Sequence, residues 1–295
     1  MSIFDGYKRK DNRETQRKMM QFQAQLKSRL HQTQYDACLE YNHYLKKCYK
    51  NPLTLKSQYS KARNLVNKYL LDNKVNVKQV NRCRSVFVLP IETLKEIKQR
   101  YNQNVITKNK TQVVVTVNEM QENIDWASTT LQEQGSHYLL KMIAIAVVTG
   151  RRFYEIGCKA TFEREANNDK QLLFTGQAKT RKNEAHESFF IPCLTSPETV
   201  INALSCLRHA KPDMVTLDYI GFNNRLSRQI NNKLAEAKLH GIKQPKDTRN
   251  LYLAYCLEKF KPRGISNNAY AASVLGHGEM DITTCNSYMT HCVIE

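Results

Sequence analysis

The run His137–Gly150 (HYLLKMIAIAVVTG) constrains the fold of this 295-residue chain more than any other segment. It is almost entirely apolar, yet it is shorter than the roughly 20 residues that a helix needs to span a bilayer. Such a run predicts a helix that is buried on most sides inside a globular core. Gly150 is expected to end the helix, because glycine readily adopts the left-handed conformation of a C-cap.

The hydrophobic period changes after this helix. Three strand-like segments follow, separated by polar turns: Lys159–Phe162, Gln171–Thr175 and Ser188–Pro192. They predict a small antiparallel sheet. Helical spacing then returns over Pro197–Arg208, Ile220–Leu239, Asp247–Phe260 and Asn268–Leu275. The predicted fold class is therefore mainly α with a small antiparallel β-sheet (α+β).

The N-terminal part is predicted to be helical throughout. Apolar residues recur at helical spacing through the first fifty residues, up to a break at Asn51-Pro52, and then over Leu53–Leu71 and Ile91–Tyr101. The polar stretch Asn102–Thr111 is expected to be a linker. Two domains follow from this pattern: a basic helical domain over residues 1–112 and a second domain over residues 113–295.

Positive charge is concentrated in the first part of the chain. The net charge is +18; residues 1–118 hold 24 Lys/Arg against 8 Asp/Glu, whereas residues 119–295 hold 21 against 19. A surplus of this size usually indicates a polyanionic partner, because each neutralised phosphate releases condensed counterions. A basic tail would lack the regular apolar spacing seen here, so we expect the first domain to bind nucleic acid.

Several protein classes are disfavoured by the sequence. The nine cysteines are scattered, with no CxxC pair and no Cys/His group at zinc spacing, which indicates free thiols, no metal and no other cofactor. The N-terminus, MSIFDGYKRK, lacks the apolar core of a secretory signal. We therefore expect a cytoplasmic protein without a membrane partner or a small-molecule substrate.

Candidate catalytic residues fall into four clusters in the second domain. Breaking a DNA strand without metal or nucleotide needs a nucleophile, cations around the phosphate, an acid for the departing oxygen and a scaffold. The first cluster, Thr149–Glu155 (TGRRFYE), has two adjacent arginines at the end of the apolar helix. A guanidinium can bind two phosphate oxygens, although an arginine pair can also simply cap a helix.

The other clusters follow in order along the chain. Gly176–Lys182 (GQAKTRK) places Lys179 between two predicted strands, where basic residues are usually solvated. Lys246–Arg249 (KDTR) opens a predicted helix. Ser273–His277 (SVLGH) precedes Thr283–Tyr288 (TTCNSY) near the C-terminus. One tyrosine among fifteen is usually structural, so the interest of Tyr288 depends on the clusters that precede it; the other candidates are better explained by helix packing, namely Tyr252, Tyr255 and Tyr270.

In this order, the four clusters resemble the catalytic domain of the tyrosine recombinases. The hairpin telomere resolvases (protelomerases) are the most similar branch, because Lys246 stands where most tyrosine recombinases have a histidine and because GQAKTR is typical of that branch. The chain departs from the common pattern in the eleven residues from His277 to Tyr288, and known members tend to be longer.

The resemblance implies a role for each residue. The residues around the scissile phosphate would be Arg152, Lys246, Arg249 and His277. Glu155 would steady the site, and Lys179 would be the general acid for the leaving 5′ oxygen. Tyr288 would attack phosphorus and form a 3′-phosphotyrosine, which needs neither metal nor ATP.

The implied reaction resolves a palindromic site into two hairpin ends. Its partner would be double-stranded DNA with an inverted-repeat target, bound by a homodimer. A site-specific integrase and a DNA-binding replication factor without chemistry are the alternatives; a type IB topoisomerase is disfavoured because Cys285–Tyr288 lacks its Ser-Lys-x-x-Tyr context. The tail Met289–Glu295 is a candidate for packing on a partner protomer.

Overall fold

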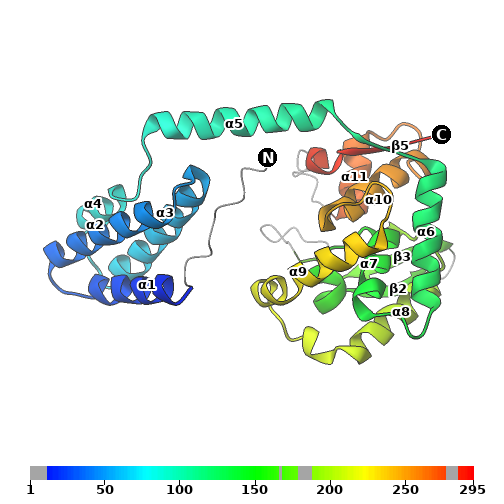
Figure 1. The fold of residues 1–295 in the computed structure, drawn as a ribbon, viewed down its shortest axis with the longest axis horizontal. Helices are drawn as coiled ribbons and strands as arrows, with labels where there is room; N and C mark the ends of the chain where they lie inside the picture. Colours follow the sequence, from blue (N-terminus) through cyan, green and yellow to red (C-terminus); the bar gives the residue numbers. More distant parts are fainter. Residues whose placement is uncertain (1–11, 166–167, 179–187, 277–284) are drawn as a thin grey trace. The chain divides into compact units, whose positions relative to one another are not determined.

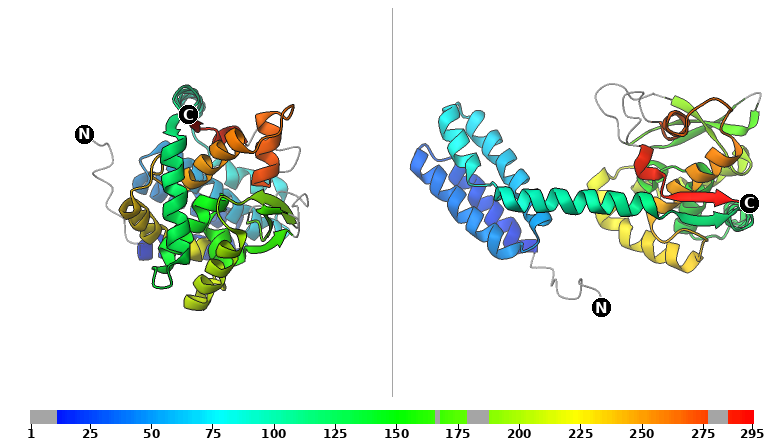
Figure 2. Two further views of the ribbon diagram at one scale, coloured as in Figure 1. Left: turned by 90° about the vertical axis from the view of Figure 1, so that its right-hand side faces the viewer. Right: turned by 90° about the horizontal axis from the view of Figure 1, so that it is seen from above.

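A computed structural model of the chain describes residues 12–165, 168–178, 188–276 and 285–295. The chain divides into two compact units, Met1–Ile106 and Thr107–Glu295, drawn in Figures 1 and 2. The division falls before the boundary expected after residue 112. Helices predominate, and one three-stranded antiparallel sheet accompanies them, so the predicted α+β class is confirmed.

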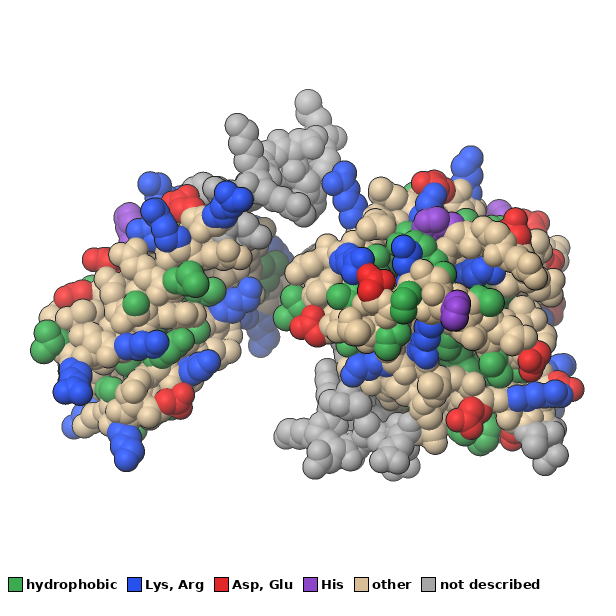
Figure 3. Space-filling model, turned by 90° about the horizontal axis from the view of Figure 1, so that it is seen from below, with side chains coloured by type: hydrophobic (Ala, Val, Ile, Leu, Met, Phe, Trp, Pro, Cys, Tyr) green, Lys and Arg blue, Asp and Glu red, His purple; other side chains and the backbone are tan. Residues whose placement is uncertain are grey.

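The described part of the first unit is built from helices. In chain order these are α1 (Asn12–Leu26), α2 (His31–Cys48), α3 (Pro52–Val66), the π-helical turn η1 (Asn67–Leu71), α4 (Val77–Ser85) and most of α5 (Ile91–Lys110). Aromatic rings fill the core: Phe22 stacks on Tyr41 with 4.4 Å between ring centroids, and Phe87 meets Tyr41 edge-on. Lys and Arg side chains are spread across the face of this unit seen in Figure 3.

The break at Asn51-Pro52 is confirmed, because the Asn51 side chain caps α3 and Pro52 occupies its first turn. Two other expectations are wrong, and one helix was missed. Residues 12–48 form two helices rather than one, since the chain turns at residues 27–30 without a Gly or Pro to mark the turn. Helix α4 has few apolar residues and was not predicted. The stretch expected as a linker continues α5 to Lys110, because no Gly or Pro interrupts it.

Helix α7 (Tyr138–Thr149) is the central helix of the second unit, as predicted. Every residue from Met142 to Thr149 is buried. Gly150 ends the helix with a φ of +64°, and a Cβ at this position would lie 2.1 Å from the ring of Tyr252. None of the described helices is both long and apolar enough to cross a membrane.

Within the described part of the chain, four α-helices pack most extensively against α7. They are α6 (Val117–Gln132), α8 (Pro197–Ala210), α9 (Tyr219–Ala237) and α10 (Pro245–Lys259). Helix α6 begins with a capping box, in which the side chain of Thr116 accepts from the backbone of Glu119 and the Glu119 carboxylate accepts from the backbone of Thr116. A 3-10 turn, η3 (Pro212–Met214), joins α8 to α9.

The predicted antiparallel sheet is confirmed, with strand order β2-β3-β4. Its strands are β2 (Thr161–Glu165), β3 (Asn168–Thr175) and β4 (Ser188–Pro192). The first strand begins two residues later than expected, because Lys159 ends a π-helical turn, η2 (Glu155–Lys159). The last helical elements are α11 (Asn267–Leu275) and the 3-10 turn η5 (Asn286–Tyr288).

A second, two-stranded sheet was not predicted. Strand β1 (Val113–Thr116) pairs in parallel with β5 (His291–Ile294), at the C-terminal end of the chain. The tail that was expected to pack on a partner protomer thus has a partner strand within its own chain. Each of these strands has only four residues, which is too few to show the alternation of apolar and polar residues that predicts a strand. The two strands also lie far apart in the sequence.

Candidate active site

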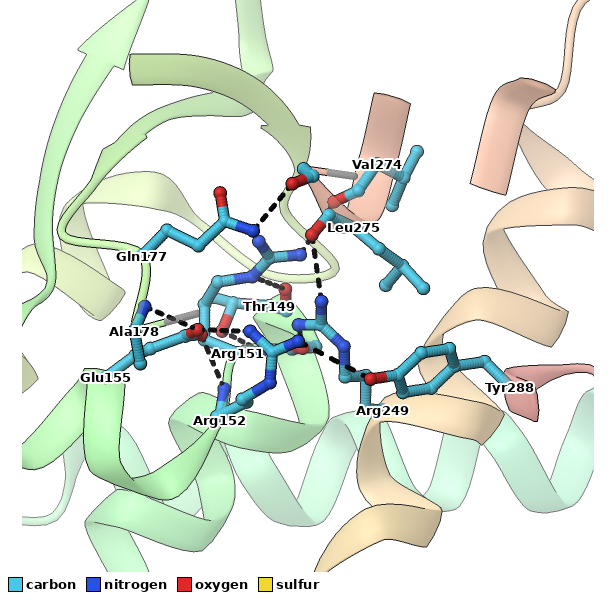
Figure 4. A network of polar contacts seen from close by, with 12 residues as sticks. Thr149, Arg151, Arg152, Glu155, Gln177, Ala178, Arg249, Val274, Leu275 and Tyr288 are labelled. Carbon is cyan, nitrogen blue, oxygen red and sulfur yellow. Dashed lines mark hydrogen bonds and ion pairs between the residues drawn. The ribbon is translucent and has the colours of Figure 1, made fainter. Parts of the chain in front are cut away.

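Four of the six residues expected to act on DNA line one pocket of the second unit, with a volume of about 560 Å³. Arg152 follows α7, Lys246 and Arg249 lie near the start of α10, and Tyr288 ends η5. Figure 4 shows Arg152, Arg249 and Tyr288 directed toward one another. The other two expected residues, Lys179 and His277, lie outside the described residues.

The first of the two adjacent arginines, Arg151, is 1% exposed. Its Nη2 donates to the carbonyl of Val274 at 2.7 Å, and its Nε donates to the carbonyl of Thr149 at 3.1 Å. The guanidinium also lies over the rings of Phe174 and Phe189, at 4.9 and 5.4 Å from their centroids. Arg151 therefore ties α7, the sheet and α11 together from inside.

The second arginine, Arg152, faces the pocket and is held by Glu155. Its Nη1 lies 2.5 Å from Glu155 Oε1, and its backbone N–H donates to Oε2 at 2.9 Å. The backbone N–H of Ala178, after β3, also donates to Oε1 at 3.2 Å. Burial alone raises the pKa of Glu155, but Arg249, Arg152 and Arg151 outweigh it and lower that pKa to about 2.

Arg249 is buried within the same network. Its Nη1 donates to the carbonyl of Gly150 at 2.8 Å, and its Nη2 donates to the carbonyl of Leu275 at 2.9 Å. Its Nε is buried and has no hydrogen-bond partner among the described residues. Burial, together with the neighbouring Arg152 and Arg151, lowers the pKa of Arg249 to about 9.

The pocket has a surplus of positive charge. Among the described residues, the charged ones that line it are all cations, Arg151, Arg152, Lys246 and Arg249, with no Asp or Glu. A buried cation costs free energy unless a counter-charge satisfies it. One carboxylate, Glu155, lies against three arginines, so an entering phosphate diester would compensate the remaining charge.

Tyr288 lies against three of these cations. Its hydroxyl is 3.4 Å from Arg152 Nη2, and the charged groups of Lys246 and Arg249 lie 4.9 and 5.3 Å from the centre of its ring. Burial raises the pKa of Tyr288, but the cations Arg249, Arg152 and Lys246 outweigh burial, and the pKa falls below its ordinary value of 10. A phenol with a lowered pKa is a better nucleophile near neutral pH.

The backbone on both sides of Tyr288 is fixed by residues of the same chain. Lys246 Nζ donates to the carbonyl of Ser287 at 2.8 Å, and Gln112 Nε2 donates to the carbonyl of Met289 at 3.2 Å. Asn250 Nδ2 then donates to Thr290 Oγ1 at 2.8 Å. The tyrosine is thus positioned by α10 and by the segment that leads into β1.

The last three carbonyls before His277 are each held by a side chain. Besides Val274 and Leu275, which the two buried arginines bind, the carbonyl of Gly276 accepts from Gln177 Nε2 at 2.6 Å. Gly276 has a φ of +66°, and a Cβ there would lie 2.3 Å from the ring of Phe189. The motif GQAKTR includes Gln177, but its binding to α11 could not be read from the sequence.

Comparisons with known proteins confirm the resemblance to telomere resolvases. Residues 104–291, more than half of the chain, match the family model of the telomere resolvase ResT/TelK catalytic domain. Telomere resolvase ResT of Borreliella burgdorferi is 26% identical over 247 residues, which are 79% of this chain and 52% of that protein. The chain therefore spans about half the length of this relative.

Solved structures share the fold. A protelomerase TelA mutant complexed with DNA hairpin product has a TM-score of 0.72 at 20% identity, with 93% of this chain and 83% of that chain covered. Protelomerase TelK complexed with substrate DNA has a TM-score of 0.55 at 17% identity, with 95% and 60% covered. By its match over residues 104–291, the chain belongs to the telomere resolvase ResT/TelK catalytic domain family.

Proposed function

We propose that this chain cuts and rejoins double-stranded DNA through Tyr288 and converts an inverted-repeat site into two covalently closed hairpin ends. The observation that carries the proposal is the Tyr288 hydroxyl, 3.4 Å from Arg152, in a pocket whose charged lining residues, within the described part of the chain, are all cations. These are the groups that phosphodiester exchange requires. Membership of the telomere resolvase family supports hairpin ends as the product.

In the proposed first step, Tyr288 Oη attacks the scissile phosphorus. A bond forms between phosphorus and Oη, and the bond from phosphorus to the 5′ oxygen breaks. The phenolic proton of Tyr288 passes to water, and the 5′ oxygen gains a proton, for which Lys179 is the proposed donor. The residues proposed to stabilise the pentavalent transition state are Arg152, Lys246, Arg249 and His277.

In the second step, the freed 5′ hydroxyl of one strand attacks the phosphotyrosine of the opposite strand. This attack releases Tyr288 and closes a hairpin, and the bond energy comes from the phosphotyrosine ester itself. Two protomers are needed, one for each strand, so we propose a homodimer on the inverted repeat. Each protomer is proposed to cut with its own Tyr288, because Lys246 and Asn250 of the same chain hold the nucleophile segment.

The test is incubation with a circular plasmid that carries the inverted repeat of the protein's own replicon, without added metal or ATP. The expected product is linear DNA whose strands snap back after denaturation, and Tyr288→Phe protein should give none. Exchange between two sites would instead indicate an integrase, relaxation a topoisomerase, and binding without cutting a replication factor. Such a substrate would place the reaction at a bacterial nucleoid or in a phage-infected cytoplasm.

A further inference from the structure

Gly276, at the end of α11, lies between the two arms of the β3–β4 hairpin. Gln177, two residues after β3, donates from Nε2 to the carbonyl of Gly276 at 2.6 Å. Phe189, on β4, lies so close that a Cβ at Gly276 would be 2.3 Å from its ring. Figure 4 shows the Gln177 side chain directed toward the end of α11. Both arms of the hairpin therefore fix the residue that precedes His277 in the chain.

The backbone on both sides of Gln177 is fixed as well. On one side, Thr175 ends β3 and pairs with Ser188 of β4. On the other side, the backbone N–H of Ala178 donates to the buried Glu155 carboxylate at 3.2 Å. Gln177 is thus held in place by the sheet and by the network under the pocket, so its amide is a rigid support for Gly276.

An amide at position 177 is a poor choice for stability alone. The Oε1 atom of Gln177 is buried and has no hydrogen-bond partner within the described part of the chain. A buried acceptor without a partner costs free energy, and an unbranched methionine would fill the same space without that cost. What the amide supplies is the donor at Nε2, which holds Gly276. The choice of residue therefore indicates a role in positioning.

We infer that Gln177 is a positioning residue that aligns the proposed general acid with a proposed phosphate ligand. Lys179 follows Gln177 by two residues, and His277 follows Gly276 directly. The hydrogen bond from Gln177 to Gly276 therefore ties together the two segments that lead to these groups. The inference rests on the proposed function, which assigns the leaving 5′ oxygen to Lys179 and the scissile phosphate to His277. A misplacement of about 1 Å can slow a reaction roughly 100-fold.

The first test separates positioning from stability. Gln177→Met keeps the length of the side chain and removes the donor together with the unpartnered oxygen, so urea unfolding should change little. Single-turnover cleavage of the target DNA should nevertheless slow by roughly 10- to 100-fold. Gln171→Met, the same substitution within β3, is the matched control and should cut at the wild-type rate. A loss of cleavage that only follows a loss of stability would overturn the inference.

The second test identifies the groups through which Gln177 acts. In a target with a 5′-bridging phosphorothiolate, sulfur replaces the leaving 5′ oxygen. A thiol has a pKa of about 8.5, so it leaves as a thiolate without a donated proton. The defect of Gln177→Met should be several-fold smaller on this target, because Lys179 is no longer needed as an acid. The remaining defect should disappear when Gln177→Met is combined with His277→Ala, because both changes then affect the same interaction.

The two proposals fail in different ways. Wild-type protein that forms no covalent adduct with DNA would overturn the proposed function. Three results with an active wild-type protein would overturn the positioning role of Gln177 alone: a wild-type rate for Gln177→Met, an equal defect on both targets, or a remaining defect that persists in full beside His277→Ala.

Discussion

The cations around Tyr288 lower its pKa, and this makes the pH dependence of the proposed cleavage testable. Its pKa lies below 10 because Arg249, Arg152 and Lys246 outweigh burial. Removing one cation must raise that pKa, so Lys246→Met should shift the rising limb of the single-turnover cleavage rate to higher pH. Lys243→Met, an exposed lysine outside the pocket lining, serves as the control. Identical profiles for Lys246→Met and wild type would contradict this role of Lys246.

The adjacent arginines should respond oppositely to the same substitution. Arg152→Lys keeps a charge but loses the planar fork at the pocket, so cleavage should fall on the order of 100-fold while stability changes little. Arg151→Lys cannot keep the hydrogen bonds to the carbonyls of both Val274 and Thr149. The free energy of unfolding should therefore fall by about 1–3 kcal/mol. Urea unfolding and single-turnover cleavage of both variants check this; a reversed pattern would show that the arginines exchange roles.

Glu155 makes the stability of the second unit depend on pH. Its folded pKa of about 2 lies below the ordinary 4.5, so its contribution is fully present above pH 4.5 and is lost as pH falls through 2. The difference corresponds to about 3 kcal/mol. Urea unfolding of wild type between pH 6 and 3 should show this loss, and Glu155→Gln should be less stable at pH 6 with a flatter dependence. Equal slopes for the two proteins would exclude Glu155 as the titrating group.

Sequence motifs identify the groups that face the pocket better than the groups that hold them. Arg152, Lys246, Arg249 and Tyr288 could be named because phosphate chemistry restricts residue type and order. The positions of Gln177 and Asn250 could not, since each acts by binding a backbone or side chain that only the fold brings near. The different positions of Arg151 and Arg152 could not be predicted for the same reason. Either guanidinium can bind a phosphate, and only the fold shows that Arg151 is buried and that Arg152 faces the pocket.

At the scale of elements, strong local signals predicted well and weak ones did not. Helix α7 was clear from its apolar run and its terminal glycine, and β3 and β4 from their composition. Helix α4 and the end of α5 have few apolar residues, so tertiary packing and chain continuity decide their structure. The β1–β5 pair joins residues at opposite ends of the second unit, and no local pattern encodes such a contact.

The attachment of the C-terminal strand to α10 should affect the nucleophile in front of it. Thr290→Val removes the hydroxyl that accepts from Asn250, which is 3% exposed, and leaves that amide donor buried without this partner. The cost of about 1 kcal/mol or more should loosen the segment that carries Tyr288 and slow adduct formation by about 5-fold or more. Cys292→Ser, in β5 two residues further on, is the control. An unchanged rate of adduct formation for Thr290→Val would show that this hydrogen bond does not position Tyr288.

At the scale of the whole molecule, the two units divide binding from chemistry in our proposal. The first unit holds 22 Lys/Arg against 8 Asp/Glu, a net charge of +14, and the second holds 23 against 19, only +4. The cations that line the pocket among the described residues nevertheless all belong to the second unit. Binding to long DNA should therefore weaken steeply with salt, by about 0.9 in log–log slope for each phosphate neutralised. Neutral substitutions of exposed first-unit lysines should flatten the slope of binding measured by fluorescence anisotropy, whereas Lys243→Met should not.

The most direct test of the central claim identifies the residue that carries DNA after cleavage. Protein trapped on a nicked target duplex would be digested with nuclease and trypsin. The C-terminal peptide, residues 264–295, contains two tyrosines, Tyr270 and Tyr288, and no Lys or Arg. Fragmentation by mass spectrometry should place the residual nucleotide on Tyr288. A nucleotide on Tyr270, on another peptide or on no peptide at all would contradict the account.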